Sequence, residues 1–369
     1  MNQDLFFRIA LTRVPQIGDV HARSLIQLFG TAEKVFHAPR RLLEKTEGIG
    51  PLRANNIKRF SAFADSEKEI NFILKHNIQA INFDEEQFPK RLLTAYDCPS
   101  LLYYKGKADL NPSKSIAIVG TRNQTEYGKQ LCEELIQNLQ RTQALIISGL
   151  ALGIDSSAHR AALQAGLPTV AALAHGLDKL YPHQNRQLAI EMLKNGGLIS
   201  DFPSGTAADK QNFPRRNRIV AGMCDCLVVI QSGEKGGSLI TADLANDYHK
   251  DVFAFPGRVN DPLSAGCHQL VMRHKAELIT SYEDLMERMG WNDEVVGSKK
   301  KERIPELFDQ LNHDQEKIIR LLQEKDRHID EILLNTSFST GKLAAEFLSL
   351  EMMGHIFSLP GKRYSVVNF

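Results

Sequence analysis

Cationic side chains and one aromatic residue are concentrated in the segment that runs from Lys210 to Arg218. This segment, KQNFPRRNR, also contains Phe213, Arg215 and Arg216, and it has no acidic residue. Cationic groups can follow the phosphates of a single strand, and an aromatic face stacks on its bases for roughly 1 to 3 kcal/mol each. The spacing therefore favours binding of unpaired nucleic acid. The alternative is a solvated cationic helix face with Phe213 anchored in the core.

Two glycine-containing segments are further candidates for phosphate binding. Gly120, Thr121 and Arg122 follow an apolar run, and a strand-to-helix turn exposes backbone amides at the positive end of a helix dipole. Arg122 adds a guanidinium that can form two hydrogen bonds with one phosphate. The alternative is a tight turn with a solvated arginine. Gly237 and Ser238, at the end of GEKGGS, offer amides and a hydroxyl for one more phosphate.

A third glycine-containing segment, SGLALGID, begins with Ser148 and Gly149 and also follows an apolar run. We expect Asp155 or Ser156 to cap the helix that follows it. The alternative role of Asp155 is catalytic, with His159 four residues on and on the same helix face. The sequence offers no nucleophile to accompany them.

Several chemistries lose support from the sequence. The fingerprints Gly-x-Gly-x-x-Gly and Gly-x-x-x-x-Gly-Lys-Ser/Thr are absent from the candidate loops, so no nucleotide cofactor is predicted. Five scattered cysteines without a Cys-x-x-Cys pair predict neither a disulfide framework nor a metal site. The 369 residues carry a net charge of only +1, so phosphate binding must depend on local charge.

Short apolar runs alternate with helical patterns in the middle of the chain, which predicts a parallel α/β sheet. The expected strands are 115–119, 144–148, 169–173, 197–200, 226–231 and 251–255, with helices near 156–165, 185–195 and 239–248. Leu131, Leu135 and Leu139 are spaced to cover the sheet from one helix face. Because ligands bind beyond the carboxyl ends of such strands, the candidate loops should meet at one edge.

The two ends of the chain differ from this middle part. Residues 1–65 read as short helices, and the first 60 residues contain ten Lys and Arg against five Asp and Glu. Residues 291–304 are polar and aperiodic and are typical of a linker. Residues 305–369 predict two or three helices followed by a hairpin at Pro360 and Gly361. No membrane span or secretory leader is indicated, so we expect a cytoplasmic protein.

Six ordered motifs resemble the bacterial DNA-processing protein A family (DprA, also called Smf): VGTR, SGLALGID, GLDKLYP, NFPRRNRIVAG, GSLITA and FAFPG. The resemblance covers about residues 80–285 and more loosely both ends. It implies an extended Rossmann-like parallel sheet at 80–290, an N-terminal helix-hairpin-helix or SAM-like domain at 1–65, and a C-terminal winged-helix-like domain. Gly48, Gly50 and Arg53 resemble a helix-hairpin-helix turn, although protein docking is an alternative for that domain.

The resemblance also implies a function. The family's proteins are non-enzymatic single-stranded DNA-binding dimers that protect incoming DNA during natural transformation and help load RecA against single-strand-binding protein. Carried over by motif, Arg122 would clamp a phosphate and Phe213 would stack on a base. The rest of the implied DNA-binding set is Gly120, Thr121, Ser148, Gly149, Lys210, Arg215, Arg216, Arg218, Gly237 and Ser238.

This chain departs from the family pattern at three positions. Leu152 stands where arginine is usual, which removes one charge from the second loop. His268 and Lys275 replace the usual Asn and Gly near the implied dimer surface at 267–279. The alternative function is a Rossmann-like nucleotide hydrolase with Asp155, Asp201 or Glu234 as its acid. For the C-terminal domain we favour protein contact, because Lys342 is the one cation of its expected recognition helix.

Overall fold

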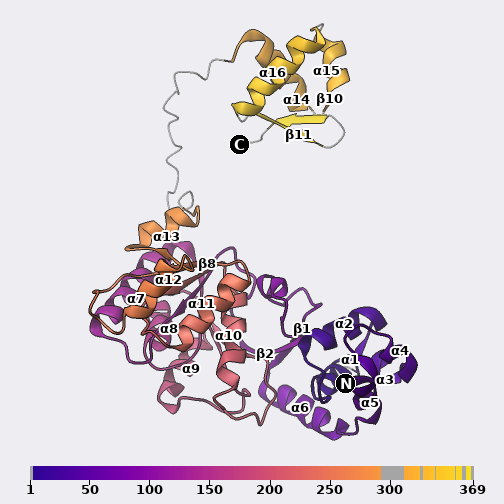
Figure 1. Cartoon of the computed structure of the whole chain (residues 1–369), viewed down its shortest axis with the longest axis vertical. Helices are drawn as coiled ribbons and strands as arrows, with labels where there is room; N and C mark the ends of the chain where they lie inside the picture. The colour runs from indigo at the N-terminus through magenta and orange to yellow at the C-terminus, as the bar shows by residue number, and fades with distance from the viewer. Residues whose placement is uncertain are drawn as a thin grey trace. The chain divides into compact units, whose positions relative to one another are not determined.

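The computed structural model describes residues 3–291, 311–324, 327–336, 338–353, 355–359 and 363–366. The chain divides into two compact units, 1–295 and 296–369, and each is described by itself (Figure 1). The predicted linker, after Trp291, and the predicted turn at 360–361 lie outside the described residues. The boundary predicted between 1–65 and 80–290 falls inside the first unit and stays a prediction.

Six helices at the start of the first unit form what we call the helical module, residues 3–76. They are α1 Gln3–Thr12, α2 Asp19–Phe29, α3 Ala32–His37, α4 Arg40–Glu44, α5 Gly50–Arg59 and α6 Phe63–His76. Gly48, in the turn before α5, and Gly50, the first residue of that helix, have positive φ angles of 76° and 60°. Arg53 joins this turn to the one before α2, because its guanidinium donates to the carbonyls of Gly48 (2.9 Å) and Gln16 (3.1 Å).

A nine-stranded sheet follows, in the spatial order β1-β2-β6-β5-β4-β3-β7-β8-β9. The six predicted strands are present as β3 Ser115–Val119, β4 Leu145–Ser148, β5 Thr169–Ala172, β6 Gly197–Ser200, β7 Cys226–Val229 and β8 Asp251–Ala254. These six strands pair in parallel. Three strands were not predicted: β1 Gln79–Asn82 and β2 Leu101–Gly106, which pair antiparallel, and β9 Glu277–Leu278.

Helices cover both faces of this sheet, which confirms the α/β prediction. Alternate residues of β3 point to opposite faces: Ala117 packs with α10 and α11, and Ile118 packs with α7 and α8. The predicted leucine face is present, because Leu135 and Leu139 of α7 and η2 are buried. The helices of this part are α7 Glu126–Asn138, α8 Ile154–Gln164, α9 Arg186–Met192, α10 Asn212–Gly222, α11 Gly237–Asp247, α12 Ala265–Met272 and α13 Tyr282–Arg288; the short 3-10 helices are η1 Lys90–Thr94, η2 Leu139–Thr142 and η3 His183–Asn185.

The second unit has a core of its own, with Ile318, Leu322, Leu343 and Phe347 buried together. Its elements are α14 His313–Glu324, β10 Arg327–His328, α15 Ile329–Thr336, α16 Thr340–Met352, β11 Ile356–Leu359 and β12 Arg363–Val366. The three strands form one antiparallel sheet in the order β10-β12-β11. Three helices and a small sheet with a hairpin form a winged-helix arrangement, as predicted.

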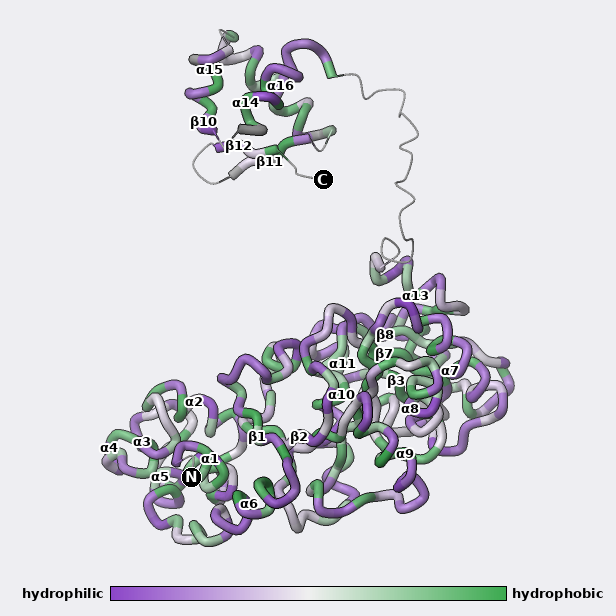
Figure 2. Tube along the Cα trace, turned by 180° about the vertical axis from the view of Figure 1, so that it is seen from behind, coloured by the Kyte–Doolittle hydropathy of each residue, from purple (hydrophilic) through white to green (hydrophobic). Residues whose placement is uncertain are grey.

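Apolar residues of the first unit are concentrated in its interior. Figure 2 shows hydrophobic colour along the central strands and hydrophilic colour along much of the surrounding helices. In the part of the chain that the structure describes, no helix is both long and apolar enough to span a bilayer.

Candidate nucleic-acid interface

The loops after β3, β4 and β7 meet α10 in one cavity of about 320 Å³, which we call the rim cavity. It lies beyond the carboxyl ends of the parallel strands, where the sequence predicted a binding edge. Eight of the twelve predicted DNA-binding residues line it: Gly120, Thr121, Arg122, Gly149, Phe213, Arg216, Gly237 and Ser238. The motifs that contribute them are separated by up to about a hundred residues in the sequence, so the fold creates this site.

Close backbone approach explains why the loops at this edge contain glycine. Gly153 has a φ of 81°, and a Cβ there would lie 2.6 Å from the carbonyl oxygen of Arg122. A Cβ on Gly120 would lie 2.5 Å from the side chain of Ile154. The loops after β3 and β4 therefore pack directly on one another, which places the backbone of Arg122 beside the loop after β4.

Phe213 lies at the wall of the rim cavity, between two arginines. The guanidinium carbons of Arg122 and Arg216 lie 5.3 and 6.0 Å from the centroid of its ring. The ring is partly exposed, and a second cavity of about 70 Å³ beside it is lined by Leu152, Tyr181 and other apolar residues. The ring of Tyr181 lies 6.0 Å from that of Phe213, centroid to centroid. Because its ring is partly exposed at the cavity wall, Phe213 is not a core anchor.

Arg216 forms part of the cavity floor and is 6% exposed. Its guanidinium donates to the carbonyl of Ala172 and to Oδ1 of Asn217 (3.1 Å). Burial raises the pKa of Asp155, and the charge of Arg216 opposes that rise. Burial also lowers the pKa of Arg216, and the charge of Asp155 opposes that decrease. The two groups are thus buried opposite charges that influence one another, and both flank Gly149.

The remaining wall of the rim cavity is formed by the start of α11. Gly236 precedes this helix without a side-chain cap, and the first turn has no acidic residue. Ser238 is buried and its hydroxyl lies 2.8 Å from that of Ser232. Lys235, in the same loop, is exposed. Amides at a helix start together with a nearby ammonium group are suited to a phosphate.

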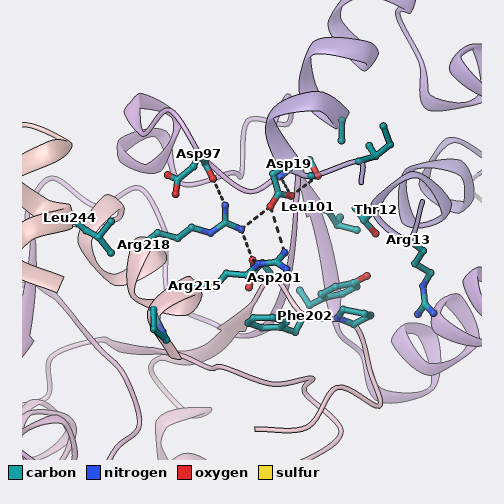
Figure 3. Close-up of a pocket in the computed structure, with 17 residues that line it drawn as sticks. Thr12, Arg13, Asp19, Asp97, Leu101, Asp201, Phe202, Arg215, Arg218 and Leu244 are labelled. Carbon is teal, nitrogen blue, oxygen red and sulfur yellow. Dashed lines mark hydrogen bonds and ion pairs between the residues drawn. The ribbon is translucent and has the colours of Figure 1, made fainter. Parts of the chain in front are cut away.

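Four predicted site residues are placed differently from the prediction. Ser148 is fully buried, and its hydroxyl donates to the carbonyl of Ile118 at 2.6 Å. Lys210 is exposed and does not line the rim cavity. Arg215 and Arg218 line a different cavity, of about 390 Å³, on the other side of α10 (Figure 3). The expectation that three arginines of α10 line one pocket is wrong, because residues at successive helix positions are about 100° apart.

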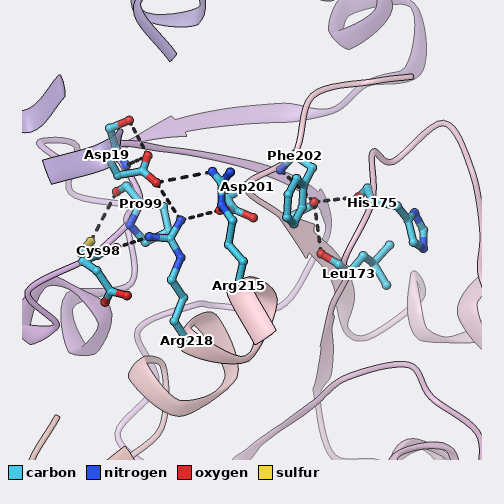
Figure 4. A network of polar contacts seen from close by, with 12 residues as sticks. Asp19, Cys98, Pro99, Leu173, His175, Asp201, Phe202, Arg215 and Arg218 are labelled. Carbon is cyan, nitrogen blue, oxygen red and sulfur yellow. Dashed lines mark hydrogen bonds and ion pairs between the residues drawn. The ribbon is translucent and has the colours of Figure 1, made fainter. Parts of the chain in front are cut away.

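Arg215 and Arg218 form an ionic cluster instead (Figure 4). Arg218 donates to carboxylate oxygens of Asp19 at 2.7 Å and of Asp201 at 2.5 Å. Arg215 contacts Asp201 at 3.1 Å. Although burial acts to raise the pKa of Asp19, the charge of Arg218 and a hydrogen bond from Ser100 hold that pKa below its usual value.

Buried polar side chains hydrogen-bond to the carbonyls of the loop after β4, a role that was not predicted from the sequence. The ring of His159 is fully buried, with Nε2 2.5 Å from the carbonyl oxygen of Gly149 and Nδ1 2.6 Å from Oγ1 of Thr169. Asn185 donates to the carbonyls of Leu150 (2.9 Å) and Ala151 (3.3 Å). The spacing of Asp155 and His159 on one helix face was the available signal for this support.

The predicted helix cap in this loop is wrong. The N-cap of α8 is Gly153, and no side chain caps the helix. Asp155 lies in the first turn and accepts a hydrogen bond from the amide of Ala151 at 3.3 Å. Its carboxylate is thereby committed to the loop and to Arg216.

The first prediction concerns pH. Burial lowers the pKa of His159 to about 4, whereas an unfolded histidine titrates near ~6.5. The unfolded state therefore gains a proton first, and stability should fall as pH decreases from ~6.5 toward ~4, by up to about 3 kcal/mol. Urea unfolding at about pH 7.5 and about pH 5 measures this loss. His159→Gln should be less stable at the higher pH but show a smaller loss, and equal losses in both proteins would contradict the assignment.

The second prediction concerns Gly149. A Cβ at this position would lie 2.5 Å from Oδ2 of Asp155 and 2.7 Å from both Nη atoms of Arg216. Both side chains are buried, so Gly149→Ala should destabilise the protein by about 1 to 3 kcal/mol in chemical unfolding. Gly18→Ala is the control, because a Cβ added at Gly18 would have no atom within 4 Å. Equal stability of the two variants would show that the loop can move away.

Two family models match this chain. The model for DNA recombination-mediator protein A matches residues 79–290, and the model for the DprA winged helix domain matches residues 305–362. Protein Smf of Synechocystis is 30% identical and aligns with 98% of this chain and 99% of its own length.

Two solved structures are similar to this chain as well. DNA processing protein A from Streptococcus pneumoniae is 31% identical with a TM-score of 0.65, over 76% of this chain and 95% of that one. DNA processing protein A from Helicobacter pylori is 30% identical with a TM-score of 0.53, over 58% and 96%, and its structure is described in terms of a single-stranded DNA binding mode. With the six ordered motifs and the winged-helix unit, these matches show that the chain belongs to the DNA recombination-mediator protein A (DprA) family.

Proposed function

We propose that this protein binds single-stranded DNA without sequence preference, through the rim cavity. The observation that carries the proposal is the position of Phe213 in the rim cavity. Arg122 and Arg216 lie beside its ring, and the start of α11 lines the same cavity. An aromatic face with adjacent cations is the arrangement that non-specific single-strand binders use. The Helicobacter pylori relative, which is described as binding single-stranded DNA, supports the same assignment.

The proposed division of labour follows from charge and exposure. Arg122 and Lys235 are exposed, so they would meet phosphates directly, and the amides of Gly237 and Ser238 would add hydrogen bonds. Arg216 is buried against Asp155, so it would contribute at the cavity floor. Arg215, Arg218 and Ser148 are left out of the proposed contact set, because their side chains do not line this cavity.

The three candidate catalytic acids of a nucleotide hydrolase either lie beside arginine side chains or lie outside the rim cavity. Asp155 faces Arg216, and Asp201 is paired with two arginines of α10. Glu234 is exposed on its loop and does not line the rim cavity. These placements support a binding protein rather than a nucleotide hydrolase.

The cellular part of the proposal rests on the family. We propose that the protein acts in the cytoplasm as a homodimer that protects incoming DNA in natural transformation and loads RecA in competition with single-strand-binding protein. The proposed dimer surface is the region of α12 and β9, where Met272 is 71% and Leu278 44% exposed. His268 contacts Gly257 and Lys275 pairs with Asp243 at 2.7 Å, so neither departure from the family pattern is left unsatisfied.

The third prediction separates stacking from phosphate contact. Each lost phosphate contact should change the slope of log affinity against log salt by ~0.7 for a single strand. Arg122→Gln should therefore make the slope less steep by that amount. Phe213→Ala should weaken binding by about 1 to 3 kcal/mol with an unchanged slope, because stacking releases no counterion. Fluorescence titration of a labelled oligonucleotide at several salt concentrations measures both quantities.

Arg141→Gln is the matched control for these variants. Arg141 is exposed, and it precedes β4 and so lies at the opposite edge of the sheet. Its replacement should leave slope and affinity unchanged. If all three variants behave alike, or if duplex DNA of the same length binds equally well, the rim cavity is not the single-strand site.

The fourth prediction is a gain of affinity. Leu152 is 42% exposed beside Phe213 and Tyr181, at the position where the family usually has arginine. Leu152→Arg should tighten single-strand binding and steepen the salt slope by ~0.7, as expected for one added phosphate contact. Leu152→Gln has similar length without charge and should leave the slope unchanged. An identical slope in both variants would place Leu152 away from the strand.

A further inference from the structure

Helix α10 separates two cavities and presents different residues to each. Phe213, Arg216 and Asn217 line the rim cavity. Arg215 and Arg218 line the cavity between α10 and the helical module, together with Asp19 of that module (Figure 3). The two cavities therefore have this helix as a common wall.

Arg218 joins three segments that are far apart in the sequence (Figure 4). Its Nη2 donates to Asp19, in the first turn of α2, and to Asp201, which follows β6. Its Nη1 donates to the carbonyl oxygen of Asp97. Asp19 is also held by Ser100, whose amide and hydroxyl both donate to Oδ1 at 3.0 Å. Of the two arginines of α10 that contact Asp19, Arg218 makes the shorter contact between this helix and the helical module.

The burial of this cluster restricts how its members can move. The side chains of Arg218, Asp19 and Asp201 are 7%, 14% and 1% exposed. Separating α2 from α10 would break the ion pair between Arg218 and Asp19, which removes one charged partner from each of these groups and is unfavourable. Arg215 is a weaker fastening, because its side chain is 50% exposed and its contact with Asp19 is 3.6 Å long.

We propose that Arg218 is a positioning residue that couples docking of the helical module to occupation of the rim cavity. This inference rests on the proposed function. Arg218 holds α10 in the position in which Phe213 and Arg216 face the cavity, without contacting DNA itself. Since coupling between two sites is reciprocal, a strand bound in the rim cavity also holds α2 in place.

Hydrogen exchange of the full-length protein tests this coupling, with and without a saturating thymidine 30-mer. In the wild type the oligonucleotide should slow exchange in residues 237–241, which border the cavity, and in residues 19–29 of α2, which do not. In Arg218→Met the protection of 237–241 should persist at saturation and that of 19–29 should disappear. Affinity should fall about fivefold or more with an unchanged salt slope. Asp19→Asn removes the negative charge of one partner at nearly constant shape and should give the same pattern, and Arg218→Lys should restore part of the affinity.

Arg8→Met is the matched control. Arg8 is also 7% exposed and also pairs with two carboxylates, those of Asp4 and Asp84, neither of which is paired with an arginine of α10. It should lower stability without a comparable loss of affinity or of the protection of α2. If Arg8→Met weakens binding as much as Arg218→Met, the effect of Arg218 is general destabilisation and the coupling is overturned.

The remaining outcomes separate the two proposals. Absence of protection at 237–241 in the wild type would contradict the proposed function itself. Protection at 237–241 without protection of 19–29 would contradict the coupling alone. Protection of 19–29 that survives in both Arg218→Met and Asp19→Asn would mean that the strand contacts α2 directly, which also overturns the coupling.

Discussion

The burial of one guanidinium, that of Arg216, is the constraint on which the binding edge depends. A buried cation is tolerated only when charge and hydrogen-bond partners surround it. Asp155 supplies the opposite charge, and the carbonyl of Ala172 and the side-chain oxygen of Asn217 accept hydrogen bonds from Arg216. Both charged groups lie close to the backbone of Gly149, which leaves room for them because it lacks a side chain. The loop after β4, the end of β5 and helix α10 are therefore held together at one point.

The same helix explains how the first unit is organised around its site. One face of α10 forms a wall of the rim cavity and its opposite face meets the helical module. Behind the loop after β4, His159 and Asn185 hold its carbonyls with neutral hydrogen bonds. The contact of α10 with the helical module is therefore an ion pair, whereas the loop after β4 is supported by hydrogen bonds to its carbonyls.

The sequence predicted the elements of this fold that have a strong local signal. Short β-branched runs marked the six parallel strands, and the loops that follow them reached one edge as parallel topology requires. The strands β1, β2 and β9 were missed, because an antiparallel edge pair and a two-residue strand lie outside the alternation. Arg122 and Phe213 could be chosen by residue type and spacing. The separate placement of Arg218 could not, because it depends on Asp19, 199 residues away.

Photo-crosslinking tests the central claim most directly, because it reports which residue touches a base. A single-stranded oligonucleotide with 5-iodouracil at every second position would be irradiated with the full-length protein and digested with trypsin. If Phe213 stacks on a base, the peptide covering residues 211–215 becomes a principal crosslinked product, and a duplex of equal length labels it far less. Crosslinks confined to the helical module or to the winged-helix unit, with that peptide unlabelled, would contradict the account.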